Sequence, residues 1–431
     1  MGEAKNVVIC QSGGPTAVIN NSLRAVIETC REYPEVFGTV YGAFHGVEGI
    51  MTEKLVNLSA QPKEEVALLR TTPTAGYIGS CRYKLKEHNT EDFDRVLDVL
   101  TAHDVGYLFY IGGNDTMDTA NKISMLARER GHGLVATGVP KTIDNDVGDS
   151  EFTLIDHTPG YGSVARYWAN MVSMVNEENK GTFGFGPVLV LQAMGRKIGY
   201  ITAAARLADP NREIPMRIYM AESNYTLDEI ADDVNDLLKE KKRAIVVVSE
   251  GLNVGDLGAS IDQFGHPQFG ASQMTVAQKI VNHLNDVGLV TKGKAKGQVP
   301  GTDQRGNIIS ASNVDLDEAY ALGQQAVKIA MENGNGYMST ILRNPTRYYS
   351  IRYDKVALSL VANSERTFPT QWLNEKKNDV TDEFIKYAKP LLGNDWVSIP
   401  LENGMMRFAR LTPIFAEKKL KPYVPQDYRQ K

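Results

Sequence analysis

Short apolar runs alternate along this chain with stretches in which apolar residues recur every three or four positions. Short apolar runs bounded by turn residues are typical of buried strands, and the second spacing is typical of helices that pack through one face. Because the two patterns alternate, the chain is predicted to form an α/β fold built on mainly parallel sheets. The predicted strands are residues 6–10, 36–44, 107–111, 133–139, 187–193 and 244–249.

Two of the predicted strands run through glycine turns into predicted helices. Gly13 and Gly14 follow the first strand, and the segment from Gly112 to Thr116 follows the strand at 107–111. Such a turn presents backbone N–H groups and the positive end of a helix dipole to an anion, which favours phosphate binding. A glycine pair can also serve only as a tight turn.

A third loop, after the strand at 133–139, carries the most distinctive chemistry. It offers Lys141, Thr142, Asp144, Asn145 and Asp146, which together supply a cation, a hydroxyl, two carboxylates and an amide. A polar surface turn is the alternative interpretation, because Asp and Asn favour turns. Strand ends of a doubly wound sheet lie along one edge, so three such loops in one chain indicate a shared phosphate site.

Arg82 follows a flexible Gly-Ser turn and is also suited to reach a phosphate. It could equally face solvent.

Composition narrows the class of protein. The chain has 431 residues, of which 42% are hydrophobic and 23% charged, and this length predicts two lobes. A net charge of -5 gives no basic surface for nucleic acid, so none is expected as a partner. Three scattered cysteines indicate a reducing, cytoplasmic setting, and no apolar stretch long enough to cross a membrane occurs.

The motifs resemble those of the 6-phosphofructokinase family, and within it the pyrophosphate-dependent enzymes. The match spans roughly residues 5–363 and keeps the family's motif order. The resemblance implies two Rossmann-like lobes with the active-site cleft between them. The matching motifs are Gly13-Gly14, Gly112 to Thr116, Pro140 to Asp146, Met194-Gly195-Arg196 and Glu250-Gly251.

The resemblance also implies a division of the chain. Residues 1–150 are expected to form the phosphoryl-donor lobe, completed by about 306–363, and residues 151–305 the sugar-phosphate lobe. Residues 364–431 extend beyond the compact bacterial pattern of the family, and no role is predicted for them. The extension finishes in a basic, proline-containing tail at 418–431, and we expect the end of this tail to be mobile.

On the donor side, the resemblance makes Asp144 the catalytic base and Thr142 a ligand of the sugar or the transferred phosphate. Asp146 is expected to hold Mg²⁺. Asn114 stands where many relatives carry a metal-binding aspartate, so it is expected to act as a weaker ligand or through water.

Donor choice is expected to depend on two further positions. Asp115 replaces a glycine that leaves room for a nucleotide's α-phosphate in ATP-dependent relatives, and Lys141 supplies a charge suited to compact pyrophosphate. Gly13, Gly14 and Arg82 complete the predicted donor site.

On the acceptor side, Met194, Gly195 and Arg196 are expected to bind the sugar phosphate and Glu250 its hydroxyls. Later positions that match phosphate-binding residues of the family are Lys296, Thr302 and Arg305. Arg305 fits the family pattern, whereas Lys296 and Thr302 depart from it. A solvated loop lysine is the alternative interpretation of Lys296, because it belongs to a basic run with Lys292 and Lys294. Lys296 replaces an arginine that a neighbouring subunit offers in the family, and Pro187 replaces another such arginine.

The predicted protein is therefore a cytoplasmic, Mg²⁺-dependent homo-oligomer that uses pyrophosphate and fructose 6-phosphate. The alternatives are an ATP-dependent enzyme, a non-catalytic regulatory subunit of the family, and a nicotinamide dinucleotide-binding protein. The last lacks the Gly-x-Gly-x-x-Gly fingerprint after its first strand. Sedoheptulose 7-phosphate is a second plausible acceptor.

Overall fold

Two sheets organise the chain in the computed structural model, which describes residues 3–86, 88–258, 260–261, 267–268, 272–362 and 364–429. Each sheet belongs to its own compact unit, and both units are assembled from separate stretches of chain. The first unit comprises Met1–Gly160, Asn313–Arg366 and Trp396–Lys431, and the second comprises Tyr161–Ser312 and Thr367–Asp395. Residues 364–431 are therefore shared between the two units.

The first unit is built on a seven-stranded sheet with the order β13-β12-β5-β4-β1-β2-β3. Its five central strands are parallel, and antiparallel strands β13 and β3 form the two edges. The predicted α/β fold with mainly parallel sheets is confirmed. The strands are β1 Lys5–Gln11, β2 Phe37–Ala43, β3 Leu55–Asn57, β4 Val105–Gly112, β5 Val135–Pro140, β12 Tyr337–Arg343 and β13 Ile351–Ala357.

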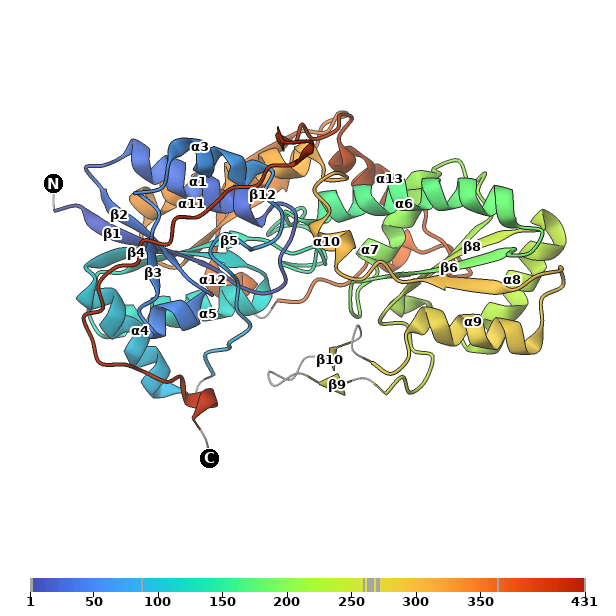
Figure 1. Ribbon diagram of the computed structural model, residues 1–431, viewed down its shortest axis with the longest axis horizontal. Helices are drawn as coiled ribbons and strands as arrows, with labels where there is room; N and C mark the ends of the chain where they lie inside the picture. Colours follow the sequence, from blue (N-terminus) through green and yellow to red (C-terminus); the bar gives the residue numbers. More distant parts are fainter. Residues whose placement is uncertain are drawn as a thin grey trace. The chain divides into compact units, whose positions relative to one another are not determined.

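Helices cover both faces of this sheet (Figure 1). Helices α1 and α11 lie on one side, where Val7 and Ile9 of β1 pack with Leu23 of α1 and Val327 of α11. Helices α4 and α5 lie on the other side (Figure 1). The helices are α1 Ile19–Glu32, α2 Val47–Met51, α3 Lys63–Ala67, α4 Thr90–Ala102, α5 Asn114–Glu129, α11 Asn313–Asn333 and α12 Leu358–Val361.

The second unit contains a four-stranded parallel sheet with the order β11-β6-β8-β7. Helices α8 and α9 share one buried cluster with strands β6 and β8. A capping box opens α8, because Thr226 Oγ1 accepts a bond from Glu229 N (3.2 Å) and Glu229 Oε2 accepts one from Thr226 N (2.8 Å). The elements are β6 Val188–Ala193, β7 Met216–Tyr219, β8 Ala244–Ser249, β9 Ser260–Ile261, β10 Pro267–Gln268, β11 Ala295–Gln298, α6 Tyr161–Thr182, α7 Tyr200–Ala203, α8 Leu227–Lys241, α9 Val276–Val287, α10 Asp303–Gly306 and α13 Asp382–Ala388.

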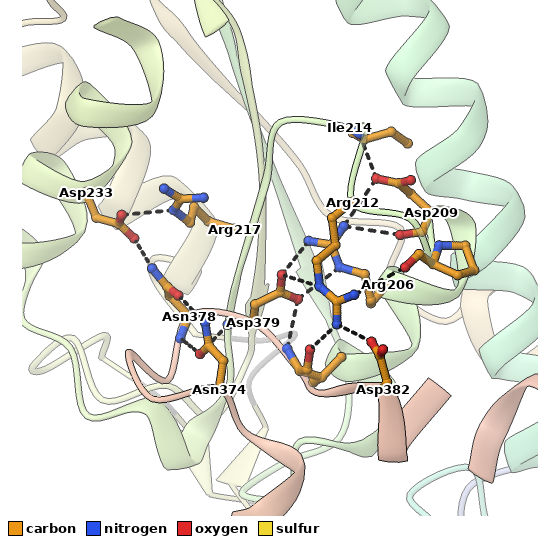
Figure 2. A network of polar contacts seen from close by, with 12 residues as sticks. Arg206, Asp209, Arg212, Ile214, Arg217, Asp233, Asn374, Asn378, Asp379 and Asp382 are labelled. Carbon is orange, nitrogen blue, oxygen red and sulfur yellow. Dashed lines mark hydrogen bonds and ion pairs between the residues drawn. The ribbon is translucent and has the colours of Figure 1, made fainter. Parts of the chain in front are cut away.

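A buried ion pair fastens the segment 367–395 to the second unit (Figure 2). Arg206 is 1% exposed, and its Nε and Nη2 atoms donate to the two carboxylate oxygens of Asp379 at 2.9 and 2.8 Å. Asp209 accepts a further bond from Arg206. Nearby, exposed Asp382 pairs with Arg212 at 2.8 Å.

Residues 396–429 pack on the first unit. Residues 430 and 431, at the end of the tail that was predicted to be mobile, lie outside the described residues. The tail contains a short hairpin, β14 Leu401–Glu402 and β15 Met405–Met406, and then pairs with edge strand β3. Figure 1 shows it crossing the first unit in red and ending near α4. Among the described residues, no helix is both long and apolar enough to cross a membrane.

Candidate active site

Three neighbouring strands of the first unit deliver the loops that were predicted to bind phosphate. Strands β5, β4 and β1 are adjacent and parallel, so their carboxyl ends lie at one edge of the sheet. Pairing continues past the strands, because Ser12 N donates to Ile111 O (3.0 Å) and Lys141 N donates to Gly112 O (2.9 Å). This edge carries Gly13, Gly14, Asn114, Asp115, Lys141, Thr142, Asp144 and Asp146.

The Lys141 ammonium is buried behind the first glycine loop. Lys141 is only 2% exposed, and its Nζ donates to Ser12 O (3.0 Å) and Gly14 O (2.7 Å). Gly13 lies between these carbonyls with a φ of 79°, in the region that favours glycine. Lys141 therefore orders the loop and also places a positive charge behind the backbone that is expected to hold phosphate.

Asp115 lies in the first turn of α5, where its carboxylate is paired. Its Oδ2 atom is 3.1 Å from Nζ of Lys84, a residue that sequence reasoning missed. Arg82 comes two residues earlier, directly after Cys81, whose carbonyl oxygen accepts a bond from Gly13 N (3.0 Å). The segment 81–84 thus runs beside the glycine loop and reaches the start of α5.

The loop that carries Asp144 is held from behind by the chain segment 158–160. Thr142 N donates to Pro159 O (3.0 Å), and Thr158 N donates to Asn145 Oδ1 (2.9 Å). Asn145 has a φ of 58°, a left-handed conformation that asparagine tolerates better than most residues. The Thr142 hydroxyl oxygen also accepts a bond from Asp144 N (3.1 Å). Asp144 is half-buried on a loop whose path these bonds define.

Asn114 connects this loop to a later part of the chain. Its Nδ2 donates to Asp146 O (3.2 Å), and its Oδ1 accepts a bond from Ser364 Oγ (3.2 Å). Ser364 Oγ in turn accepts a bond from Gly148 N (3.0 Å). Asn114 therefore supports the loop through both ends of its amide, and metal binding by this residue stays a prediction.

The carboxylates of the first unit fit Mg²⁺ bound together with phosphate. Within the described ranges, no group of three His, Cys, Asp or Glu side chains could hold a metal ion. Mg²⁺ usually binds one or two carboxylates and completes its six positions with phosphate oxygens and water. Asp144 and Asp146, two residues apart beside the glycine loops, supply such a donor set, whereas the described residues form no all-protein metal cage.

In the second unit, Glu250 organises the loop that follows β6. Its Oε1 atom accepts bonds from the backbone N–H groups of Gly195 (3.2 Å) and Arg196 (3.1 Å). Gly251 lies so close that a Cβ atom there would be 1.6 Å from Arg196 O, so only glycine fits. Burial raises the pKa of Glu250, and these two N–H groups oppose the rise. Both loop bonds use the same carboxylate oxygen.

Gln304 ties the segment with Arg305 to the same loop. Its Oε1 accepts bonds from Met194 N (2.9 Å) and Trp168 Nε1 (3.0 Å), while its Nε2 donates to Gly301 O (2.9 Å). The positive charges of Arg196 and Arg305 both act to lower the pKa of Glu250. The structure thus brings Met194, Gly195, Arg196, Glu250 and Arg305 together.

Lys296 and Thr302 are placed differently. Thr302 is exposed directly before α10. Lys296 pairs with Leu189 near the amino end of β6, and its Nζ lies 4.9 Å from the centre of the Phe185 ring. Since Met194 follows the carboxyl end of β6, Lys296 does not join the Met194 loop within this chain. Pro187 comes immediately before β6, at the same end as Lys296.

The chain belongs to the phosphofructokinase family, whose model matches residues 6–330. Two similar proteins are pyrophosphate–fructose 6-phosphate 1-phosphotransferases. The protein from Halomonas elongata is 36% identical over 96% of this chain and 98% of its own length. The protein from Methylococcus capsulatus is 34% identical over 97% and 98%. The crystal structure of pyrophosphate-dependent phosphofructokinase from Marinobacter aquaeolei superposes with a TM-score of 0.87 at 32% identity, covering 97% of this chain and 99% of that one.

Proposed function

We propose that this protein transfers a phosphoryl group from pyrophosphate to the 1-hydroxyl of fructose 6-phosphate. The products are fructose 1,6-bisphosphate and phosphate, and the reaction is reversible. The observation that carries the proposal is the shared sheet edge of the first unit, where two glycine loops meet buried Lys141 and the carboxylates of Asp144 and Asp146. The names of the similar proteins agree with this assignment.

Asp144 acts as the general base in this proposal. As the bridging P–O bond of pyrophosphate breaks, the sugar 1-hydroxyl forms the new P–O bond and its proton passes to the Asp144 carboxylate. Phosphoryl transfer passes through a loose transition state, so most of the catalysis comes from positioning and charge stabilisation. The bonds that define the Asp144 loop supply the positioning, and Lys141 with the loop N–H groups supplies charge stabilisation.

Groups of the second unit hold the acceptor. Arg196 and Arg305 bind the 6-phosphate, and the Glu250 carboxylate accepts hydrogen bonds from sugar hydroxyls. The two loop N–H groups occupy Glu250 Oε1, so they orient Oε2 for this purpose. Thr302 adds a hydroxyl at the start of α10.

Mg²⁺, when bound, neutralises charge on the transferring phosphate, with Asp146 as its carboxylate ligand and Asn114 acting through water. The ion fits here because phosphate oxygens and water provide its remaining ligands.

Asp115 selects the donor. A carboxylate at the start of α5 repels the additional phosphate that a nucleotide would place there, while pyrophosphate does not extend so far. Lys84 pairs with this carboxylate at 3.1 Å and holds it at the edge of the donor site.

Initial rates with fructose 6-phosphate and Mg²⁺ test the function, with pyrophosphate and ATP compared as donors. We expect turnover with pyrophosphate, a loss of about 10²- to 10⁴-fold in Asp144→Asn, and no change in the surface control Asp98→Ala. A preference for ATP would refute the role of Asp115. Inactivity with both donors would favour the regulatory-subunit alternative.

We further propose a cytoplasmic homo-oligomer. Its support is the exposed position of Lys296, at the opposite end of β6 from Met194, since family members use this position to serve a neighbouring subunit. The free and buried thiols of Cys10, Cys30 and Cys81 suit a reducing compartment. Sedimentation velocity of the purified protein tests the assembly, and a monomer at micromolar concentration would contradict it.

A further inference from the structure

The last part of the described chain forms a strap over the first unit. We use the name terminal strap for residues 412–429. Its first portion extends the seven-stranded sheet, because Asn57 N donates to Ile414 O and Ala416 N donates to Leu55 O, both at 2.8 Å. The strap then runs to α4 (Figure 1), where it makes polar contacts with Asp92.

Asp92 of α4 receives the end of the terminal strap. This carboxylate is fully buried, and its Oδ1 accepts bonds from Tyr423 Oη (2.7 Å) and Gln426 N (3.0 Å). Its backbone N–H donates back to Gln426 Oε1 (3.2 Å). Its Oδ2 accepts a bond from Tyr83 Oη. We call residues 81–86 the donor segment, so the strap and the donor segment share one carboxylate.

The terminal strap also contacts the donor segment directly. Asp427 N donates to Tyr83 Oη (3.2 Å), and Asp427 Oδ2 accepts a bond from Lys86 Nζ (2.8 Å). The rings of Tyr83 and Tyr428 meet edge to face with centroids 5.4 Å apart. Tyr83 is 2% exposed, so these contacts enclose its side chain.

Tyr83 lies in sequence between the two cations of the donor segment. Arg82 precedes it beside the glycine loop, and Lys84 follows it with Nζ on the carboxylate of Asp115. A side chain locked between the strap and α4 therefore determines where both cations lie. If the strap released Tyr83, Arg82 and Lys84 would lose their fixed positions at the pyrophosphate site.

We propose that the terminal strap positions Arg82 and Lys84 for pyrophosphate, with Tyr83 and Asp427 as positioning residues. The inference rests on the proposed donor site. Loss of one hydrogen bond of Tyr83 or Asp427 is expected to weaken the affinity for pyrophosphate about fivefold to thirtyfold, which corresponds to about 1 to 2 kcal/mol. The sugar phosphate is held by other groups, so its KM stays the same.

The test uses the full chain with Tyr83→Phe, which keeps the ring and removes the hydroxyl. The matched control is Tyr320→Phe, since Tyr320 Oη also donates to a carboxylate, that of Glu28 at 2.7 Å, between α11 and α1. A second control, Arg407→Met, removes an ion pair between the tail and Glu65 without touching residues 81–86. KM values for both substrates, pyrophosphate binding by calorimetry and amide hydrogen exchange over 79–86 are compared.

The proposal predicts a raised KM and Kd for pyrophosphate and faster exchange over 79–86 in Tyr83→Phe alone. Equal rises in both KM values, or a lower Tm with unchanged KM values, would overturn it and reduce the strap to a structural support. If the wild-type protein does not turn over pyrophosphate, the proposed function fails. Calorimetry and exchange then still decide whether the strap controls pyrophosphate binding.

Discussion

His157 links the stability of the first unit to pH, and a substitution there gives the sharpest test of the structure. Its ring is buried between two carboxylates, with Nδ1 2.8 Å from Asp156 Oδ2 and Nε2 2.7 Å from Glu318 Oε2. Arg343 also donates to Asp156 (2.9 Å). Burial disfavours the charged ring, but Glu318 and Asp156 outweigh it and raise the pKa of His157 to about 9.

The size of the effect follows from this pKa. The ordinary value of 6.5 rises to about 9, so the charged ring contributes about 3 kcal/mol to folding. A raised pKa means that the contribution is fully present below pH 6.5 and is lost as the pH rises through 9. Near pH 8 the free energy of unfolding should fall by about 1.2 kcal/mol per pH unit from this residue alone.

Denaturant unfolding between pH 7 and pH 10 measures this slope in the wild-type protein and in His157→Gln. The difference in unfolding free energy between the two proteins should shrink by about 2.5 kcal/mol across the range, because a small part of the contribution is already lost at pH 7. His132→Gln is the control, because His132 Nε2 hydrogen-bonds with an uncharged group, the hydroxyl of Thr101 at 2.9 Å. A constant difference between wild type and His157→Gln would refute the charged pairing.

Activity should follow, because His157 immediately precedes the segment that holds the Asp144 loop. We expect kcat of the wild-type protein to decline above pH 9 together with its stability. A kcat that stays constant while stability falls would show that the loop keeps its path without this support.

Two further substitutions test the second unit, one at the proposed sugar site and one at the buried ion pair that fastens residues 367–395. In Glu250→Gln, neutral hydrogen bonds replace charged ones at a cost of about 1 kcal/mol, so KM for fructose 6-phosphate should rise about fivefold. Glu222→Gln is the control and should leave this KM unchanged, because Glu222 is a half-buried carboxylate that also accepts a backbone N–H. A similar KM for both variants would contradict the sugar contact. In Asp379→Asn, the buried Arg206 loses its main partner, and the free energy of unfolding should drop by about 3 kcal/mol, against less than about 1 kcal/mol for exposed Asp382→Asn. Denaturant titration of both proteins measures this difference, and equal losses would show that burial does not matter at this pair.

Local patterns predicted the strands and the loops at their ends well. Each predicted strand is present, because a short apolar run bounded by polar or turn residues is a signal contained within a few residues. The meeting of the loops after β1, β4 and β5 also followed from sequence, since parallel strands of one sheet end at one edge.

Partners distant in sequence escaped prediction. Nothing local marks Lys84 as the partner of Asp115, or Ser364 as the support of Asn114, because each pairing depends on tertiary folding. The packing of the tail was not predicted for the same reason. A basic, proline-containing segment reads as mobile on its own, and only folding brings it to the carboxylate of Asp92.

The discontinuous first unit has a consequence for biosynthesis. Residues 1–160 leave the ribosome long before residues 396–429, which complete the same unit. At about 5 to 20 residues per second, the nascent unit waits tens of seconds for its last segment. During that interval β3 is an edge strand with unsatisfied N–H and C=O groups, because Ile414 and Ala416 have not yet paired with it. The newly made protein is therefore most exposed to aggregation, and most dependent on chaperones, before residues 396–429 are translated.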